Sequence, residues 1–589
     1  MSKALSIALI LLFNGLAAAQ MPVAELPRIY IDTIWRLPVG GTTWAAHTAA
    51  QLSSALKASA PGDRIVLDAG TVYAGNFVLP AKSNPSKQWI YIMSSKVAWL
   101  PQPGHRVAPS DAVNMPKIVT PNASQALLFS AGANHWRFSG IEVYSASTYR
   151  PSSTYLNYYG YSMIDTAAPG SPQLLQDSIT FDRCYIHGDA THDVQRAVGG
   201  NASNYALVDN YISEIHMAGT DSQAFAAWSS PGPFKLVNNY LAAAGENVMF
   251  GGAGGYNNPY VPSDIEFRNN YLFKPLSWVP LSLNGQMVVK NSFELKSAQR
   301  VLFDNNTIED MWKAGQNGFA IVLTIRSSQS GDVAVVNDVT ITNNILKNVT
   351  AGFNTLAADD QCGGSTNYLC KNAGSQARWN ISNNLVTFYD PRIAGGGNNA
   401  LIMFNGGWDN LGKKAGVMRD VVVQHNTTVA AASAPCWGSV FFSVGGQTPP
   451  LKNLTNNIWI LDNVLCGQPF GDWGLQGAAG MTQYMGDPGP VDTRFLGNVM
   501  YVPNGTKVQA WPAHNYATTL PFSYADPTHG NYQLLSPFWT DTSDGKLSGI
   551  DNATLQRGQG TPSSAPVVIP GNSSNQANST AATGTGYRK

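Results

Sequence analysis

Charged side chains are scarce in this chain, and several of them fall in strand-like segments. Of 589 residues, 12% are Asp, Glu, Lys or Arg, against about 25% in an ordinary soluble domain. Because side chains alternate along a strand, Glu294 and Lys296 share the outward face of segment 291–297. The same alternation predicts that Arg326 points outward from segment 320–327. A carboxylate, an amine and a guanidinium on one surface could move protons beside an acidic substrate.

These groups suit β-elimination in a polysaccharide that contains uronic acids. Such a reaction must neutralise the substrate carboxylate, remove the proton beside it and protonate the leaving oxygen. Neutralisation needs a bound cation or fixed Arg and Lys side chains, and the base is often a Lys or Arg among other cations. Glu294, Lys296 and Arg326 supply these residue types, so we predict them as the catalytic set.

Polar and aromatic residues of the neighbouring segments extend this surface. Stacked strands would align them in one row, and an aromatic ring can pack on the apolar face of a sugar. The predicted substrate-binding residues are Arg196, Gln223, Trp228, Asn247 and Lys290. Asp221 and Glu246 carry the carboxylate oxygens that calcium prefers, so we predict a calcium site there and no other cofactor.

A repeated phrase marks the elements that would position these residues. Each copy is a short β-branched run, a polar residue, an Asn and another apolar pair. The Asn residues are Asn210, Asn239, Asn270, Asn306, Asn344, Asn384, Asn426, Asn463 and Asn498, and Cys184 takes this place in an earlier copy. Their spacings of 26 to 42 residues are typical of solenoids, propellers or arrays.

The contents of the repeat favour a parallel β-helix. The copies are strand-like, without a helical period. Asn tolerates left-handed backbone angles, and its amide can bond to an Asn stacked above it, which requires equal turns lying over one another. Residues 44–58 have helical spacing and would cap the open end of the solenoid. Extra residues in the longer repeats belong to loops, which would wall a cleft.

The run APGDRIVLDAGTVYAGNFVLP and the Asn phrases resemble the pectin-lyase-like superfamily. PGPFKLVNNYLAAAGENVMFGG, VPSDIEFRNNYLFKPLSW and NSFELKSAQRVLFDNN resemble, more narrowly, a group of secreted bacterial right-handed β-helix repeat proteins. This resemblance implies an all-β, right-handed parallel β-helix with a short N-terminal capping helix and inserted loops. The superfamily includes polysaccharide lyases, glycoside hydrolases and non-catalytic adhesins.

Two short runs, SFELKSAQ and VLTIRSS, resemble the Lys and Arg motifs of the alginate lyase and chondroitinase B family. The resemblance implies that Lys296 is the base and that Arg326 is the cation on the acid side. The sequence departs from that family where Ser-Ser follows Arg326 in place of His-Gly, and where the gap of 30 residues between the two motifs is longer.

Two other functions remain open at this point. A glycoside hydrolase needs two carboxylates about 5–9.5 Å apart. Coils stacked about 4.8 Å apart would let Asp221, Glu246 and Glu294 supply such a pair, and Asp359-Asp360 is another candidate. A non-catalytic glycan-binding adhesin or matrix protein would use the same surface without cleavage.

The ends of the chain indicate export. Residues 1–19 read as a signal peptide, 27–557 as the β-helix domain, and 558–589 as a disordered low-complexity tail. We therefore expect a secreted monomer, extracellular or periplasmic, that acts on an extracellular polysaccharide and has no membrane contact after signal removal. The 36 Lys and Arg balance 36 Asp and Glu, which argues against a nucleic-acid partner.

The five cysteines do not form a disulfide scaffold. Cys362 and Cys370 bracket a Gly-rich loop and could pair in an oxidising compartment. Cys436 and Cys466 could form a second bridge across neighbouring coils, whereas Cys184 is expected to be a buried small residue.

Overall fold

The computed structural model describes most of the chain between residues 23 and 558. The described residues are 23–37, 39–145, 162–167, 174–228, 230–252, 260–326, 334–356, 375–389, 399–405, 417–431, 436, 440–443, 455–467, 494–501, 514–536 and 541–558. The signal peptide at 1–19, the tail beyond residue 558 and the Cys362–Cys370 bridge lie outside these residues and stay predictions.

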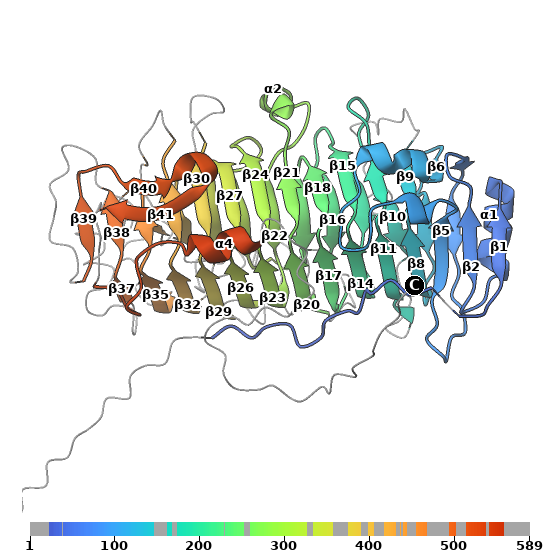
Figure 1. Ribbon diagram of the computed structural model, residues 1–589, viewed down its shortest axis with the longest axis horizontal. Helices are drawn as coiled ribbons and strands as arrows, with labels where there is room; N and C mark the ends of the chain where they lie inside the picture. The colour runs from blue at the N-terminus through green and yellow to red at the C-terminus, as the bar shows by residue number, and fades with distance from the viewer. Residues whose placement is uncertain are drawn as a thin grey trace, which may run out of the picture.

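Three parallel sheets wind around one long axis and form a right-handed parallel β-helix (Figure 1). Sheet 1 has β1 (Thr43–Ala46), β2 (Arg64–Leu67), β5 (Ile90–Ser94), β8 (Asn134–Ser139), β11 (Asp177–Asp182), β14 (Ser203–Val208), β17 (Phe234–Val237), β20 (Ser263–Arg268), β23 (Ala298–Asp304), β26 (Val336–Thr342), β29 (Ser375–Ser382), β32 (Val417–Gln424), β35 (Thr455–Leu461) and β37 (Arg494–Leu496). Sheet 2 has β3 (Val72–Ala74), β6 (Lys117–Thr120), β9 (Glu142–Ser145), β12 (Tyr185–His187), β15 (Tyr211–Ile215), β18 (Tyr240–Ala243), β21 (Tyr271–Phe273), β24 (Thr307–Met311), β27 (Ile345–Val349), β30 (Leu385–Phe388), β33 (Thr427–Val429), β36 (Val464–Leu465), β38 (Val499–Tyr501) and β39 (Tyr516–Thr518). Sheet 3 has β4 (Phe77–Leu79), β7 (Leu127–Phe129), β10 (Ser162–Thr166), β13 (Arg196–Gly199), β16 (Gln223–Ala227), β19 (Glu246–Phe250), β22 (Asn291–Leu295), β25 (Phe319–Thr324), β28 (Ala351–Leu356), β31 (Ile402–Asn405) and β34 (Val440–Ser443). The predicted all-β solenoid is confirmed.

A few elements lie outside these sheets. They are the helices α1 (Ala49–Ala58), α2 (Val279–Leu283) and α4 (Asn552–Gly558), the 3₁₀ turns η1 (Val97–Trp99), η2 (Pro109–Asn114), η4 (Leu276–Trp278) and η5 (Pro527–His529), and the antiparallel strands β40 (Ser523–Asp526) and β41 (Asn531–Ser536). In Figure 1, α4 and the β40–β41 hairpin lie in front of the strands at the C-terminal end. Ile550 and Leu555 pack there against Leu385 of sheet 2.

Buried asparagines form a ladder at the turn between sheets 1 and 2. The Nδ2 and backbone N–H of Asn344 donate to Oδ1 of Asn384 at 2.8 and 3.0 Å, and each rung repeats this pattern. The ladder runs through Asn210, Asn239, Asn270, Asn306, Asn344, Asn384, Asn426, Asn463, Asn498 and, beyond the predicted set, Asn515. The left-handed backbone angle belongs to the residue before each rung, such as Asn343 with φ of 59°, because the chain bends there from one sheet to the next.

Aromatic side chains from successive coils stack inside the solenoid. Phe138 lies on Phe181 with ring centroids 4.6 Å apart, and Phe267 lies on Phe303 at 5.0 Å. All four side chains are buried. Burial of each such side chain contributes roughly 1.5–3 kcal/mol, and the equal spacing of the coils lets the same column repeat. A rigid interior of this kind fixes the positions of the outward residues.

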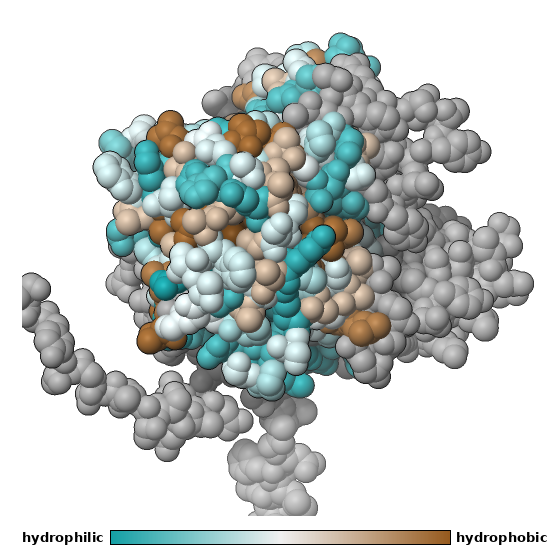
Figure 2. Space-filling model, turned by 90° about the vertical axis from the view of Figure 1, so that its right-hand side faces the viewer, coloured by the Kyte–Doolittle hydropathy of each residue, from teal (hydrophilic) through white to brown (hydrophobic). Residues whose placement is uncertain are grey.

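Helix α1 covers the N-terminal end of the solenoid, as predicted from residues 44–58. Its buried face consists of Leu52, Ala55 and Leu56, and the Thr48 side chain accepts a hydrogen bond from the backbone N–H of Gln51. Figure 2 shows this end of the molecule, where hydrophobic side chains are interspersed with hydrophilic ones. The cap therefore closes the first strand edges without leaving a continuous apolar face.

The N-terminal segment 23–37 runs along the outside of sheet 1 across several coils (Figure 1). The backbone N–H of Glu25 donates to Asp338 at 3.0 Å, and that of Arg28 donates to Asp264 at 2.8 Å. Both acceptors belong to sheet 1, so the segment ties distant coils together. The sequence carried no signal for this contact.

The disulfide between Cys436 and Cys466 is formed, with Cα atoms 5.6 Å apart. It joins the coil of β34 to the next coil, as predicted. Cys184 is free and fully buried, which also agrees with its prediction. Within the ranges described above, no helix is long and apolar enough to cross a membrane.

Candidate functional site

A cleft of about 560 Å³ lies over sheet 3, at the coils that carry β22, β25 and β28. Its lining consists of Gly252, Lys290, Glu294, Lys296, Gly315, Gln316, Asn317, Phe319, Val322, Thr324, Arg326 and Asn354. The sequence analysis predicted four of these as site residues, namely Lys290, Glu294, Lys296 and Arg326. It did not predict the amide side chains of Gln316, Asn317 and Asn354. A concave site with convergent polar groups on a rigid sheet is a common setting for binding or catalysis.

Strand alternation brings Glu294 to this cleft. Phe293 pairs in register with Ile321 of β25, and both side chains are buried in the interior. The next position pairs Glu294 with Val322, which pairs in turn with Asn354 of β28. These three side chains form an outward column across three coils, because a strand turns alternate residues to opposite faces.

Lys296 follows directly after β22, and Arg326 lies two residues after the end of β25 on the neighbouring coil. The Nζ of Lys296 is 3.7 Å from Oε2 of Glu294 and 3.3 Å from Sδ of Met249, and the lysine side chain is 16% exposed. A Cβ on Gly252, whose φ is 89°, would lie 2.3 Å from Cδ of Lys296. The lysine stem therefore passes over a position that only glycine leaves open.

A second row of charged and polar groups runs along the first residues of β13, β16 and β19. The Nε of Arg196 donates to Oε1 of Gln223 at 2.9 Å, and Nε2 of Gln223 donates to Oε2 of Glu246 at 2.8 Å. The Nζ of Lys290 donates to Oδ2 of Asp221 at 2.5 Å and lies 3.6 Å from Oε1 of Glu246. The structure brings these five predicted residues together, and they bind one another.

Burial shifts the pKa values of the ionisable side chains at the inner end of this row. Burial lowers the pKa of the Arg196 guanidinium, against the opposing charges of Asp165 and Glu246. Burial likewise raises the pKa of Asp165 to about 6, although its Oδ1 accepts the backbone N–H of Thr166 at 2.9 Å. Asp165 was missed, and its only signal in the sequence is a lone carboxylate within an apolar strand.

Two residues predicted to bind substrate, Trp228 and Asn247, instead contact other groups of the protein. The guanidinium carbon of Arg196 lies 4.6 Å from the ring centre of Trp228, so this ring stacks on a cation. Asn247 is fully buried, and its Nδ2 donates to the carbonyl oxygens of Leu241 at 2.7 Å and Phe273 at 3.0 Å. The prediction that Asn247 lies on the outward surface is wrong, because its amide donates to two carbonyl oxygens of the sheet 2 strands β18 and β21.

Lys274 is a buried residue that the sequence analysis missed. Its Nζ donates to the carbonyl oxygens of Ala243, Ala244 and Gly245 at 2.7, 3.0 and 3.0 Å. Burial lowers the pKa of this lysine to about 7. The amine holds the turn that leads into Glu246, and only its place directly after an apolar strand could have marked it.

The residues predicted to hold calcium do not fit that ion in this arrangement. Calcium takes about six to eight oxygen ligands. Asp221 and Glu246 instead face the ammonium of Lys290, and the other carboxylate oxygen of Glu246 accepts from Gln223. A positive charge held between the two carboxylates repels a divalent cation. Asp221 and Glu246 therefore do not form a calcium site in this arrangement.

The same burial bears on the hydrolase alternative. The side chains of Glu246 and Glu294 are 0% and 3% exposed, against 32% for Asp221. A hydrolase needs two carboxylates that both reach the glycosidic bond. Among the described residues of this candidate set, Asp221 alone is well exposed, and Asp359-Asp360 lies outside the described residues.

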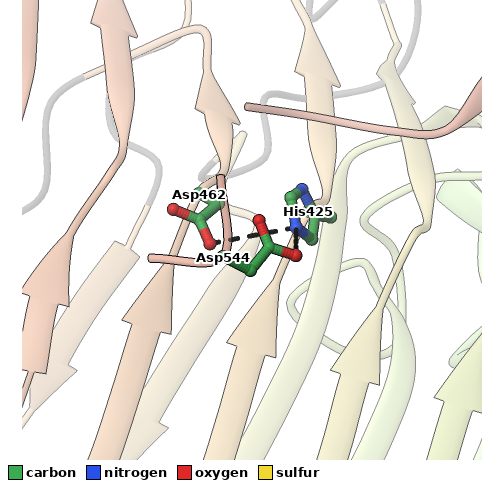
Figure 3. Close-up of side chains that lie close together, drawn as sticks. All are labelled: His425, Asp462 and Asp544. Carbon is green, nitrogen blue, oxygen red and sulfur yellow. Dashed lines mark hydrogen bonds and ion pairs between the residues drawn. The ribbon is translucent and has the colours of Figure 1, made fainter. Parts of the chain in front are cut away.

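A group of His425, Asp462 and Asp544 lies near the C-terminal end (Figure 3). The Nε2 of His425 is 3.1 Å from Oδ2 of Asp544 and 3.8 Å from Oδ2 of Asp462. These donor types suit a divalent metal, but the buried Asp462 also accepts hydrogen bonds from the backbone and hydroxyl of Ser543. The group therefore fastens the C-terminal segment to the solenoid.

The all-parallel sheets, the N-terminal cap and the outward cleft define a right-handed parallel β-helix protein. Among solved structures, the chain resembles the PL6 family alginate lyase AlyGC with 14% identity and a TM-score of 0.49. That match covers 90% of this chain and 59% of the AlyGC chain.

Two further solved structures resemble this chain at lower scores. A PL6 alginate lyase in complex with a trisaccharide has 10% identity and a TM-score of 0.42, covering 90% of this chain and 96% of that one. The catalytic unit of a GH87 alpha-1,3-glucanase from Streptomyces thermodiastaticus strain HF3-3 has 12% identity and a TM-score of 0.41, covering 83% and 72%. No family model matches the chain, and no curated protein matches its sequence.

Proposed function

We propose that this protein is a polysaccharide lyase that cleaves an acidic, uronate-containing polysaccharide by β-elimination. The observation that carries the proposal is the meeting of Lys296, Arg326 and Glu294 in one cleft on neighbouring coils. Lys296 and Arg326 line the cleft as cations beside the carboxylate of Glu294, whereas the charge of Lys290 is balanced by Asp221 and Glu246. Two cations close together at one end of the cleft favour an anionic group of the substrate over a neutral one.

In the proposed reaction, Nζ of Lys296 takes the proton from the carbon beside the substrate carboxylate. The electron pair of that C–H bond becomes a carbon–carbon double bond while the bond to the glycosidic oxygen breaks. The leaving oxygen takes up a proton from solvent on the side where Arg326 holds a fixed positive charge, and Lys296 returns its proton to solvent, so that the amine is regenerated. Glu294, 3.7 Å from Nζ of Lys296, orients the base.

Fixed cations would neutralise the substrate carboxylate. Lys290 and Arg326 both line the cleft, and the carboxylates predicted to hold calcium are bound to Lys290. Asn354, Gln316 and Thr324 offer amide and hydroxyl groups for sugar hydroxyls at the same surface. The leader-like residues 1–19 agree with export to a compartment where such polymers occur.

The experiment that tests this function is product analysis over a panel of polymers. Purified protein is incubated with alginate, pectate, glycosaminoglycans and neutral glycans, and ultraviolet absorbance of unsaturated uronates is followed beside new reducing ends. Absorbance together with new ends is the expected result. New ends alone would mean a hydrolase, and co-sedimentation with a glycan without cleavage would mean a binding protein; either result contradicts the proposal.

A further inference from the structure

Lys290 lies between the two carboxylates that would otherwise form a cation site. Its ammonium donates to Oδ2 of Asp221 at 2.5 Å and is 3.6 Å from Oε1 of Glu246. The side chains of Lys290 and Asp221 are 20% and 32% exposed, and that of Glu246 is fully buried. Two carboxylates alone would carry a charge of −2 in this partly buried pocket, and the ammonium reduces it to −1. The smaller net charge lowers the free-energy cost of burying these groups.

Oxygen acceptors without donors border this position. Oε1 of Glu246 and Oδ1 of Asn291 are buried and accept no hydrogen bond from any residue of the described ranges. Glu246 and Asn291 are register partners on the adjacent strands β19 and β22, and Lys290 directly precedes Asn291. Acceptors gathered in this way need a cation or a donor nearby, and the ammonium of Lys290 is the cation beside Glu246.

The surrounding charges keep this lysine positively charged. Burial by itself lowers the pKa of Lys290, but the charges of Glu246 and Asp221 outweigh it, and the net shift is upward with a further contribution from Glu294. Burial and the charge of Glu246 raise the pKa of Asp221, against the opposing effect of Lys290 and Lys296. Lys290 is therefore a cation at neutral pH, and it is held where it also lines the cleft.

We propose that the ammonium of Lys290 is the resident cation of this site, that it takes the place a divalent ion would occupy between Asp221 and Glu246, and that the site works without a metal. Its contribution to binding an acidic substrate rests on the proposed lyase function. The exclusion of a divalent ion does not, because it follows from the arrangement of these three side chains alone.

The test compares calcium binding to wild type and to Lys290→Ala without any substrate. Both proteins are treated with a chelator, desalted and titrated with calcium by calorimetry. The wild type is expected to bind no calcium at this position. Removal of the ammonium leaves two carboxylates unpaired, so Lys290→Ala is expected to bind one calcium ion per chain, about tenfold or more tightly than the wild type. Asp221→Asn in the Lys290→Ala background is expected to remove that site.

Two controls keep the test decisive. Lys290→Gln removes the charge but keeps most of the side-chain stem, so it replaces Lys290→Ala if the alanine variant does not fold. Lys347→Ala removes a half-exposed lysine of sheet 2 that pairs with Glu309, and it is expected to bind calcium no better than the wild type. Calcium binding by the wild type that Asp221→Asn abolishes would overturn the proposal, as would the absence of binding to both Lys290 variants.

Activity provides a separate measurement. If the lyase function holds, chelator-treated wild type is expected to keep its rate within about twofold, which corresponds to about 0.4 kcal/mol in the barrier, because no step of the proposed reaction uses a metal ion. Loss of that rate with recovery on added calcium would contradict a metal-free site. If no polymer is cleaved, the lyase proposal fails while the calorimetric result on Lys290 still stands.

Discussion

The backbone N–H of Arg326 donates to the carbonyl oxygen of Lys296 at 2.9 Å. Two residues separated by 30 positions in the sequence are thus adjacent rungs of one parallel sheet. Lys296 lies one residue past the end of β22 and Arg326 two residues past the end of β25, and both line the same cleft over sheet 3. A rigid ladder of backbone hydrogen bonds therefore fixes the spacing between the proposed base and the proposed acid-side cation.

Replacing Lys296 by alanine is expected to abolish most of the lyase activity. The variant removes the amine that takes the proton, and general base catalysis contributes about 10²–10⁴-fold to a rate. The measurement is the initial rate of unsaturated uronate formation on the best polymer of the panel, with folding checked by circular dichroism. Lys347→Ala is the matched control and is expected to keep the full rate. Full activity of Lys296→Ala would reject the proposed site.

Interrupting the asparagine ladder is expected to destabilise the fold without touching the cleft. The backbone N–H of Asn306 donates to Oδ1 of Asn344 at 2.7 Å, and Nδ2 of Asn344 donates to the carbonyl oxygen of Phe303 at 3.1 Å. Asn344→Ala leaves both buried groups without these partners, at about 1–3 kcal/mol each. Urea unfolding should show a loss of roughly 2–5 kcal/mol.

The control for this variant is Asn122→Ala on an exposed turn, where the amide of Asn122 bonds to Asn76 in contact with water. Its free energy of unfolding is expected to change by less than about 1 kcal/mol. Equal losses for Asn122→Ala and Asn344→Ala would show that the ladder has no special contribution to stability.

The solenoid itself could be predicted because its cause is local and repeated. Each Asn phrase encodes the same turn, so the fold followed from the spacing and the strand-like content of the repeat, and alternation along 291–297 placed Glu294 and Lys296 at the cleft. The prediction failed at strand beginnings, where alternation does not apply. Asn247 turned inward to backbone carbonyls, and Glu246 is buried against Gln223 and Lys290.

The missed residues share a physical reason. Lys274 and Asp165 are charged groups buried by tertiary contacts that no local pattern records. Asn354 and Gln316 reach the cleft from other coils, and their type alone does not separate them from the many surface amides of this chain. The carboxylates at 221 and 246 looked like calcium ligands because sequence does not show that the amine of Lys290 lies between them.

Asp165 is expected to make stability fall as pH rises from about 4 to about 6. Its pKa is raised from 3.8 to about 6 in the folded protein, chiefly by burial. In this window the folded state holds a proton that the unfolded state releases, so each rise in pH favours unfolding. A difference of about 2 between the folded-state and unfolded-state pKa values corresponds to a loss of stability of roughly 3 kcal/mol. This loss is complete above about pH 6.

The measurement is the free energy of unfolding of wild type and Asp165→Asn between pH 4 and pH 7. The asparagine variant lacks the titration, so its stability relative to wild type is expected to increase across that window and then level off. Asn122→Ala on the exposed turn neither adds nor removes a titrating group, so it should give a constant difference from wild type. A constant difference for Asp165→Asn as well would contradict the raised pKa.

Reduction of the Cys436–Cys466 disulfide is expected to destabilise the C-terminal coils. The bond closes a loop of 30 residues, for which the loss of chain entropy in the unfolded state amounts to about 3–4 kcal/mol. Unfolding in urea is followed with and without a thiol reductant, using tryptophan fluorescence. The paired variant Cys436→Ala with Cys466→Ala should be insensitive to the reductant and unfold near the urea concentration of the reduced wild type. The disulfide lies on coils beyond β28, outside the cleft. Lyase activity should therefore persist under reducing conditions at low temperature. Loss of activity under these conditions would mean that the shape of the cleft depends on the C-terminal coils.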